Sequence, residues 1–569
     1  MSNNFKKKWK CSLSVLAITA MIFTGCTSNQ TSENAATATS NPVAAVETSS
    51  TESTSEVVVD TEFSARDLEV GYEEASATKV TFNGTNIDVS GDGAQAKDGV
   101  LTISVEGTYV ITGTLEDGQI VVDAEDTDKV QIVLNGVSIT CADQAPIYIK
   151  NADKVFITLE ENTENTLVDG TAYTQTDENN VDAVIFSKAD LTINGTGTMN
   201  ITANYNSGIV SKDDLIITGG TINITAVKDA LNGKDCVKIK DGTLTLSTTT
   251  GNGIQSKNGD DTTKGYVYIC GGKITVTKCQ EGIEGTAILI TDGTVNVTAE
   301  DDGFNAASGK EDTTETSTTT ASTTESTTTA STTTDTAATT DTAATTDTAA
   351  TTDDTTTNTD KMDRGNFGGG GGGAFEADTN CYVSITGGTI TVDAQGDGID
   401  SNGSLYISGG TIYVSGPTNG GNGSMDYNGT ADITGGTIVV AGSTGMAQGF
   451  SETSTQYSIL NNFTTVCEAG TEVKLTDKDG NVVASYVPTK EYQSVVISTP
   501  ELTKDATYTL TCGDQTAELT LSSVVTSNGE QAAMGAQGGH GGTGGPGKGG
   551  GMAKPGDTNA IDPNTTESN

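Results

Sequence analysis

The sequence predicts an all-β protein whose main domain is a parallel β-helix with about 22 residues per coil. One observation is a recurring phrase: SGIVSKDDLIITGGTINI begins at residue 207, and DGIDSNGSLYISGGTIYV begins at residue 397. A second is that apolar and polar residues alternate within each phrase with a period of two, which is typical of strands. Strands this short can bury their apolar face only by stacking on neighbouring copies.

An apolar residue occupies the same place in each phrase and marks the coils. Most successive markers are 21 to 24 residues apart, with longer gaps after Ile254 and Phe304. The first of these gaps holds the polar stretch NGDDTTK, and the second holds a tract rich in Thr, Ala and Asp. Gly-Gly or Asp-Gly pairs between the strands permit the positive φ of a corner. The markers are Ile185, Ile209, Leu231, Ile254, Ile283, Phe304 and Ile399.

Residues 1–26 are predicted to be a lipoprotein signal peptide. Several lysines precede the apolar run Leu13–Phe23, which is followed by Thr24-Gly25-Cys26. Cys26 is the expected lipidated first residue of the mature chain, and an ordinary signal peptide is the alternative. A lipid on Cys26 would tether an exported protein to the outer face of the bacterial cell membrane without a spanning segment.

The remaining chain divides by composition. Residues 27–65 are rich in Ser and Thr and are expected to be a disordered tether. The β-helix is expected over 66–454, with a disordered Thr/Ala/Asp- and Gly-rich insert at about 308–373. Hairpin patterns with Asp-Gly and Gly-Asp turns predict a small β module or cap over 455–526. The Gly-rich residues 527–569 are expected to be a disordered tail.

Charge and cysteine content limit the partners. The formal net charge of −46 argues against nucleic acid and anionic membrane surfaces as partners. It suits Ca²⁺, although acidity that merely keeps an exported protein soluble is the alternative. The seven cysteines after the export segment include no CxxC pair, which argues against a thiolate metal site. Buried thiols are the simple interpretation, and a disulfide between Cys467 and Cys512 is a further possibility.

A column of lysines follows the markers. The four members, each three residues after a marker, would stack one above another in a β-helix. One interpretation is a salt-bridged ladder with the nearby acidic residues Asp190, Asp213, Asp214 and Asp235. The other is a row of cations spaced for the carboxylates of an acidic sugar chain. The four lysines are Lys188, Lys212, Lys234 and Lys257.

An acidic column lies beside the lysines and is the candidate calcium site. Its members come two residues before or one residue after the markers, so they flank the same short strand on consecutive coils. Carboxylates from neighbouring coils could supply the six to eight oxygens that Ca²⁺ prefers. No EF-hand loop is present, and acidic corners that simply face solvent are the alternative. The candidates are Asp229, Glu281, Glu284, Asp301, Asp302, Asp397 and Asp400.

Catalysis is not expected. The only arginines, Arg66 and Arg364, lie before the coils and in the insert, and the only histidine, His540, lies in the Gly-rich tail. Asp301 and Asp302 are adjacent, and neighbouring residues on a strand face opposite ways, so they are not expected to form a catalytic pair.

Three segments carry a resemblance to a known family. APIYIKNADKVFITL (145–159), FSKADLTINGTGTMNITANYNSGIVSKDDLIITGGTINITA (186–226) and KGYVYICGGKITVT (264–277) closely resemble a family of bacterial carbohydrate-binding lipoproteins, over roughly residues 63–525 without the insert. The resemblance implies a right-handed, pectate-lyase-like parallel β-helix that binds cellulose and acidic polysaccharide, with bound calcium and without catalysis. The long insert after Phe304 departs from the family pattern.

The expected function is therefore non-catalytic recognition of a cellulosic or pectic, acidic polysaccharide at the cell surface, with calcium. A structural or adhesive surface protein that binds a protein or cell-wall partner is the alternative, followed by a polysaccharide lyase. The membrane contact is expected through the lipid anchor only. The sequence does not specify the oligomeric state.

Overall fold

The computed structural model describes residues 59–309 and 376–531, which belong to one compact unit. Every regular element in these ranges is a β-strand. The described residues accordingly include no helix with the length and apolar character that a bilayer crossing requires. Cys26, Arg364, His540 and almost all of the insert lie outside the described residues, so the expectations for them are not addressed by the structure.

One sheet has twelve strands and contains one short strand from each coil. Eleven of its members follow one another in parallel, and only the β3–β4 pair at one end is antiparallel. The strands are β3 (Ala94–Lys97), β4 (Val100–Ile103), β6 (Gln119–Asp123), β8 (Ile147–Asn151), β11 (Ala183–Ser187), β14 (Ser207–Ser211), β17 (Leu231–Gly233), β20 (Ile254–Ser256), β22 (Ile283–Gly285), β24 (Phe304–Ala306), β27 (Ile399–Ser401) and β29 (Asp426–Tyr427).

A 21-stranded sheet supplies the other two strands of each coil. In some coils a single long strand runs through both positions. Its coil strands are β5 (Gly107–Leu115), β7 (Lys129–Cys141), β9 (Lys154–Leu159), β10 (Glu164–Asp169), β12 (Asp190–Gly195), β13 (Thr198–Ala203), β15 (Asp214–Ile217), β16 (Thr221–Ala226), β18 (Cys236–Ile239), β19 (Thr243–Thr248), β21 (Tyr266–Lys278), β23 (Ala287–Ala299), β25 (Tyr382–Ile385), β26 (Thr389–Ala394), β28 (Ser404–Ser415) and β30 (Ala431–Gly442).

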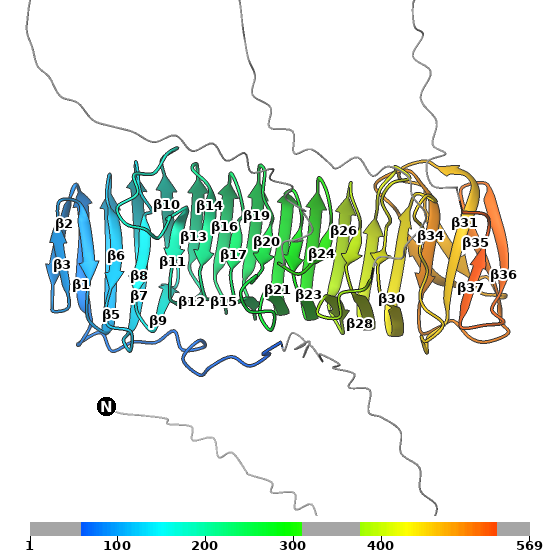
Figure 1. The fold of residues 1–569 in the computed structure, drawn as a ribbon, viewed down its shortest axis with the longest axis horizontal. Helices are drawn as coiled ribbons and strands as arrows, with labels where there is room; N and C mark the ends of the chain where they lie inside the picture. The colour runs from blue at the N-terminus through cyan, green and yellow to red at the C-terminus, as the bar shows by residue number, and fades with distance from the viewer. Residues whose placement is uncertain (1–58, 310–375, 532–569) are drawn as a thin grey trace, which may run out of the picture. The chain divides into compact units, whose positions relative to one another are not determined.

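The repeat therefore corresponds to one coil of three strands. β14 pairs in parallel with β17, β15 with β18 and β16 with β19, each one coil further along the chain. Figure 1 shows these strands side by side along the stack, with the colour changing steadily from one coil to the next. The coil after the insert continues the stack directly, since β24 pairs in parallel with β27.

The marker residues form the core between the sheets. All seven are fully buried, with 0% of their surface exposed, which confirms the inward apolar column that the alternation predicts. Each buried Ile, Leu or Phe contributes roughly 1.5–3 kcal/mol relative to an exposed one. The stack is thus stabilised coil by coil.

Glycine is required at the corners between strands. Gly388 has φ +86°, and a Cβ placed there would lie 3.0 Å from the carbonyl oxygen of Gly293 on the preceding coil. Gly220 has φ +92° at the equivalent corner of an earlier coil. A residue with a side chain would be strained by this φ and would meet the neighbouring coil.

Antiparallel strands cover both ends of the stack. β1 (Thr78–Gly84) pairs with β2 (Asn86–Ser90) at one end. At the other, β30 pairs antiparallel with β34 (Tyr492–Ser498), which also pairs with β31 (Ser458–Cys467). These pairings remove the open edge that the last coil would otherwise present.

A four-stranded antiparallel sheet follows the last coil, as the turn signals predict. Its strands are β32 (Val473–Thr476), β33 (Val482–Tyr486), β35 (Thr507–Cys512) and β36 (Gln515–Thr520). Cys467 and Cys512 form a disulfide across a Cα–Cα distance of 6.4 Å, so that possibility is realised. β37 (Val525–Asn528) pairs in parallel with β31, although the tail was predicted to begin at residue 527.

The N-terminal tether was predicted to extend to residue 65, and this is wrong for residues 59–65. Lys238 on β18 is almost fully buried, and its Nζ lies 3.0 Å from Oδ2 of Asp60. The ring of Phe63 packs near Tyr268, with 6.1 Å between centroids. A buried ammonium group needs a counter-charge, and composition alone could not show that the tether supplies it.

Candidate functional site

Polar and acidic side chains form a continuous row along the twelve-stranded sheet. The residue after each marker is paired in register with its counterpart on the next coil. The row is Gln255, Glu284, Asn305, Asp400 and Asp426. Stacked strands lie about 4.8 Å apart, so unpaired carboxylates in such a row repel one another.

A second row runs beside the first, two residues before the markers. Backbone bonds hold it together: the N–H of Gly282 donates to the carbonyl of Asp302 at 2.9 Å, and that of Gly303 to Asp397 at 2.8 Å. We call the acidic residues that the two rows bring together the acidic ladder. Its members are Glu281, Glu284, Asp302, Asp397, Asp400 and Asp426.

Three of the predicted metal ligands converge within the ladder. Asp302, Asp397 and Asp400 each offer a carboxylate oxygen, and these oxygens lie within 4.8 Å of one another. All three side chains are partly buried. Ca²⁺ binds oxygens at about 2.3–2.6 Å, so ligands on opposite sides of one ion are separated by roughly 5 Å. The spacing of the three carboxylates fits a shared cation.

Backbone amides and one side-chain amide hold three carboxylates of the acidic ladder in place. The N–H of Asp397 donates to Oδ1 of Asp302 at 2.6 Å, and the N–H of Gly423 donates to Oδ1 of Asp397. Nε2 of Gln448 donates to Oδ1 of Asp426 at 3.0 Å. Each carboxylate keeps a second oxygen that these hydrogen bonds do not use.

The expectation that Asp301 and Asp302 face opposite ways is wrong. Both residues lie in the turn before β24 rather than on a strand, so the alternation of a strand does not apply. A Cβ built on Gly396 would lie 2.4 Å from Oδ1 of each of them. Glycine at this position leaves room for both carboxylates on the same side of the turn.

Glu284 is the most deeply buried member of the ladder, at 4% exposure. It forms an ion pair with Lys257 and accepts a hydrogen bond from Nδ2 of Asn252 at 2.6 Å. In the part of the chain that the structure describes, this is the only ion pair to a ladder carboxylate. Oδ1 of Asn305, which follows Glu284 in the row, is buried and has no hydrogen-bond partner.

Burial and mutual repulsion raise the pKa values along the ladder. Burial, and then the charges of Glu284 and Asp302, raise the pKa of Glu281 to about 8. Burial, and then the charge of Asp397, raises the pKa of Asp400 to about 8. The same causes raise the pKa of Asp302 to about 6 and that of Asp397 to about 7. The ladder therefore holds more negative charge than its surroundings neutralise.

Asp229 stands apart from the converging carboxylates. Its Oδ2 accepts a hydrogen bond from Nδ2 of Asn232 at 2.9 Å, and its Oδ1 accepts one from the N–H of Asn252 at 3.1 Å. Lys228 lies 3.9 Å away. These partners satisfy the carboxylate within its own part of the stack.

The lysine column is present, but its members have different surroundings. Lys257 pairs with Glu284, and Lys234 lies 2.6 Å from Asp260 in the loop after β20. Lys188 and Lys212 are exposed, and the described residues offer neither of them an ion-pair partner. The ammonium group of Lys212 lies 5.2 Å from the centre of the Phe186 ring.

The expectation that the column lysines form a salt-bridged ladder with Asp190, Asp213, Asp214 and Asp235 is therefore wrong. Lys154, not Lys188, approaches Asp190, at 3.9 Å, and Lys264 pairs with Asp235. These partners come from other parts of neighbouring coils, which sequence spacing does not reveal.

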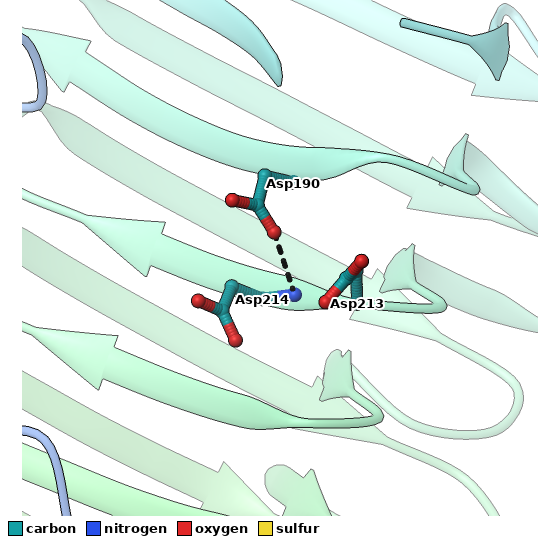
Figure 2. A group of neighbouring side chains, drawn as sticks. All are labelled: Asp190, Asp213 and Asp214. Carbon is teal, nitrogen blue, oxygen red and sulfur yellow. Dashed lines mark hydrogen bonds between the residues drawn. The ribbon is translucent and has the colours of Figure 1, made fainter. Parts of the chain in front are cut away.

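A second acidic cluster was not recognised as such from the sequence. Figure 2 shows Asp190, Asp213 and Asp214 gathered on neighbouring coils, with carboxylate oxygens within 4.8 Å. The backbone N–H of Asp214 donates to Oδ1 of Asp190 at 3.4 Å. Burial, and then the charge of Asp190, raises the pKa of Asp213 to about 7. The signal in the sequence was the acidic residues that follow Lys188, Lys212 and Lys234.

Asp426 was also missed. It extends the acidic row by one coil, since it pairs in register with Asp400. The signal was weak because its marker, Met425, stands in the phrase SMDYNG, which lacks the usual Ile or Leu.

Two of the comparisons with known proteins share one description, and the third carries a different one. A family model described as "Carbohydrate-binding domain-containing protein" matches residues 97–365. A protein of the same description from Acetivibrio thermocellus is 39% identical over 151 residues, which are 26% of this chain and 53% of that protein. The chain thus spans about half the length of this curated relative. A solved "polysaccharide lyase-like protein from C. thermocellum, Gadolinium derivative" is 33% identical, covering 42% of this chain and 93% of its own, with a TM-score of 0.36.

Proposed function

We propose that this chain is a carbohydrate-binding protein of the kind that the comparisons describe, and that it binds acidic polysaccharide, without catalysis, through calcium held on the acidic ladder. The observation that carries the proposal is the convergence of the partly buried carboxylates of Asp302, Asp397 and Asp400 from the two neighbouring rows. A pectic chain carries carboxylates of its own, and a shared cation can join them to those of the protein.

The negative charge of the acidic ladder supports the binding of a cation. Its six carboxylates have a single ion-paired lysine among the described residues. Buried charges of one sign need either protons or counter-ions. At neutral pH a divalent ion would neutralise more of this charge than protonation does, and it would remove the repulsion between coils.

The ligand set fits calcium rather than a softer metal. Carboxylate and amide oxygens are the ligands that Ca²⁺ prefers, and it takes six to eight of them. Asp302, Asp397 and Asp400 would hold the ion, and the unpaired Oδ1 of Asn305 is a further oxygen in the row. Thiolates and imidazoles, which zinc prefers, are not part of the ladder.

Exposed lysines support an acidic glycan. Lys188 and Lys212 lie one coil apart on the same column, and neither is neutralised by the described residues. Such cations would attract the carboxylates of a uronic acid chain, more strongly at low salt. Lys212 lies three coils before the coil of Glu281 and Glu284, where the ladder begins. An extended glycan that runs along the stack could therefore contact both the lysines and the ladder.

The absence of catalysis remains part of the proposal. Lys257, the cation at the ladder, is engaged by Glu284 and is not free to act as a base. Arg66 donates to Gln131 and lies over the ring of Phe156, far in sequence from the ladder. Both cations therefore have structural roles in the described chain.

We further propose that the coils form a right-handed parallel β-helix, because crossovers between parallel strands are right-handed in about 98% of cases. We also propose that the protein is exported and lipid-anchored at Cys26 on the outer face of the cell membrane. The sequence signals at residues 1–26 support the anchor.

Binding of the purified full chain to polygalacturonate, with Ca²⁺ and with EDTA, tests the proposal. Saturable binding that is lost in EDTA and restored by Ca²⁺ is the expected result. Binding that EDTA does not change would reject the role of calcium. Release of unsaturated product would show that the protein is a lyase instead.

A further inference from the structure

The segment before β1 lies across the outer face of the 21-stranded sheet, and we call residues 59–69 the N-terminal strap. Oδ1 of Asp67 on the strap accepts a hydrogen bond from Thr192 on β12 at 2.6 Å, and the ring of Phe63 lies 6.1 Å from that of Tyr268 on β21. β12, β15, β18 and β21 pair in parallel on successive coils, so the strap crosses the coils. Figure 1 shows it, in blue, along one side of the stack. Towards its N-terminus the strap therefore leads to the later coils.

The N-terminal end of the strap rests on an apolar cluster. The buried members of this cluster alternate along β18, β21 and β23 with core residues and therefore face outward. Val59, Phe63 and Leu289 pack against them. Val59 is the first residue that the structure describes, so the strap reaches this surface at its N-terminal end. The buried members are Cys236, Tyr266, Tyr268 and Ala287.

The same surface continues beyond the strap. Tyr268 pairs in register with Leu289, Leu289 with Ser384, and Ser384 with Tyr406, each one coil further along. Tyr268, beneath the strap, is 7% exposed, whereas Tyr406 is 44% exposed. The ring of Tyr406 lies 6.5 Å from that of Tyr382. We call Leu289, Tyr382 and Tyr406 the flank patch; exposed apolar patches of this kind often mark an interaction site.

Charged contacts hold the end of the strap beside the flank patch. Nζ of the buried Lys238 lies 3.0 Å from Oδ2 of Asp60. The ammonium groups of Lys238 and Lys240 each lie 5.0 Å from the centre of the Phe63 ring. A buried ammonium group needs its counter-charge, so Asp60 is fixed on β18. The chain that precedes Asp60 therefore starts next to the flank patch.

The residues directly before the strap have the chemistry that the flank patch needs. Val57 and Val58 follow residues 47–56, which are all Ser, Thr or Glu. Valine favours an extended chain, and side chains alternate along such a chain, so Val57 would face the sheet as Val59 does and Val58 would face away. Two extended residues span roughly 6.6 Å, against about 4.8 Å between coils. Val57 would thus reach the coil beyond the one that Val59 contacts.

We propose that the flank patch is the docking site for residues 54–58 of this chain, with Val57 against Leu289 and Tyr406. The strap then extends across β23, β25 and β28, and the N-terminal segment leaves the stack from its flank rather than from its end at β1. This face belongs to the 21-stranded sheet, so the docked segment leaves the acidic ladder on the twelve-stranded sheet uncovered. A lipid on Cys26 would hold the stack by that flank. The docking itself requires neither calcium nor a glycan.

A single tryptophan on the flank patch tests the docking. In the full chain, Tyr406→Trp is combined with Trp9→Phe, which removes the only natural tryptophan. Acrylamide quenches the fluorescence of an exposed tryptophan more strongly than that of a covered one. Val57→Ser should raise the quenching constant by roughly two-fold or more and shift the emission to longer wavelength, because the lost apolar contact uncovers the ring. Val58→Ser, the matched control, removes the same side chain one residue away and should change neither.

Photo-crosslinking provides a second measurement that leaves the flank patch unmodified. Benzoylphenylalanine in place of Val57 should cross-link to peptides of β23, β25 or β28 in the same chain, and the same probe in place of Thr48 should show no preference for them. Cross-links from Val57 to other strands would overturn the proposal, and so would quenching that Val57→Ser does not change. A tryptophan that becomes covered only as protein concentration rises would mean that a second copy occupies the flank patch, which would also overturn it.

Discussion

The backbone N–H of Asp397 donates a hydrogen bond to Oδ1 of Asp302 at 2.6 Å, although 95 residues separate them in sequence. The bond joins the coil before the insert to the coil after it. It also places two carboxylates of the acidic ladder beside each other. The ladder is therefore completed only because the stack continues across the insert.

The first prediction concerns pH. Glu281 and Asp400 have pKa values of about 8 in the folded chain, against ordinary values of 4.5 and 3.8. A carboxyl with a raised folded pKa binds its proton more tightly in the folded state, so stability falls as pH rises through the window between the two values. In EDTA, the melting temperature should fall from about pH 4 to about pH 8.

Calcium should reverse this dependence. Ca²⁺ binds the ionised carboxylates, so the stabilisation that it adds should grow as pH rises over the same window. Melting curves with Ca²⁺ and with EDTA at several pH values provide the measurement. A calcium effect that is equal at pH 5 and pH 8 would contradict this prediction.

The second prediction concerns Asp400→Asn. The change removes one buried charge from the ladder, so in EDTA at pH 8 the free energy of unfolding should rise by on the order of 1–3 kcal/mol. The stabilisation by Ca²⁺ should be largely lost, because one converging oxygen no longer carries charge. Urea unfolding with and without Ca²⁺ measures both effects.

The matched control is Asp88→Asn, which removes the same charge from an exposed position on β2. It should leave both stability and the calcium effect within about 0.5 kcal/mol of the unmodified chain. Destabilisation of Asp400→Asn in EDTA would mean that the ladder is not under electrostatic strain.

The third prediction concerns the exposed lysines. Replacing Lys188 and Lys212 together by Gln should weaken binding to polygalacturonate several-fold and reduce its salt dependence, with little change in stability. Lys273→Gln, an exposed lysine on β21, is the control and should bind normally. Equal binding by the double variant and the control would remove these lysines from the proposed glycan surface.

The fourth prediction concerns the N-terminal segment. The side chain of Asp67 is 2% exposed, and its Oδ1 lies 2.9 Å from Nζ of Lys154 and accepts a hydrogen bond from Thr192 at 2.6 Å. Replacing Asp67 by Asn leaves the largely buried ammonium group of Lys154 with only the more distant Asp190, at 3.9 Å, as a counter-charge, which should cost roughly 3 kcal/mol. Glu69→Gln, at an exposed carboxylate 3.6 Å from Arg66, should cost less than about 1 kcal/mol.

The same carboxylate should respond to acid. Burial alone would raise the pKa of Asp67, but hydrogen bonds from Thr192, Lys154 and Ser64 outweigh it and hold the pKa below 3.8. The stability contributed by Asp67 is present above its unfolded value and is lost as pH falls through the lower folded one. Acid unfolding should therefore begin at higher pH in Asp67→Asn than in the unmodified chain. Identical acid midpoints would show that Asp67 does not contribute.

Much of the fold follows from local pattern. Alternation predicts the strands, the recurring phrase predicts the coil, and Gly388 marks a corner where a side chain would strike the preceding coil. The hairpins after residue 455 follow from their turn residues. The antiparallel pairing of β34 with β30 could not be predicted from local pattern, because that pairing depends on how the end of the stack is covered.

The candidate site was likewise predicted only in part from the sequence. Periodicity placed Asp397 and Asp400 in one column with Glu281 and Glu284, since stacked coils repeat their register. It misjudged Asp301 and Asp302, which lie in a turn. It also assigned Asp190 and Asp235 to the wrong lysines. Contacts between side chains on different coils depend on side-chain direction and reach, which spacing does not encode.

The sequence by itself determined the coil, its short strands and the column in which the acidic residues stack, because each repeats with a period that backbone geometry fixes. The tertiary structure decided which carboxylates converge, which lysines are neutralised and where the N-terminal segment lies. Those features arise where segments distant in the chain meet. The charge, burial and shape of such places depend on tertiary packing, which cannot be predicted from local sequence pattern.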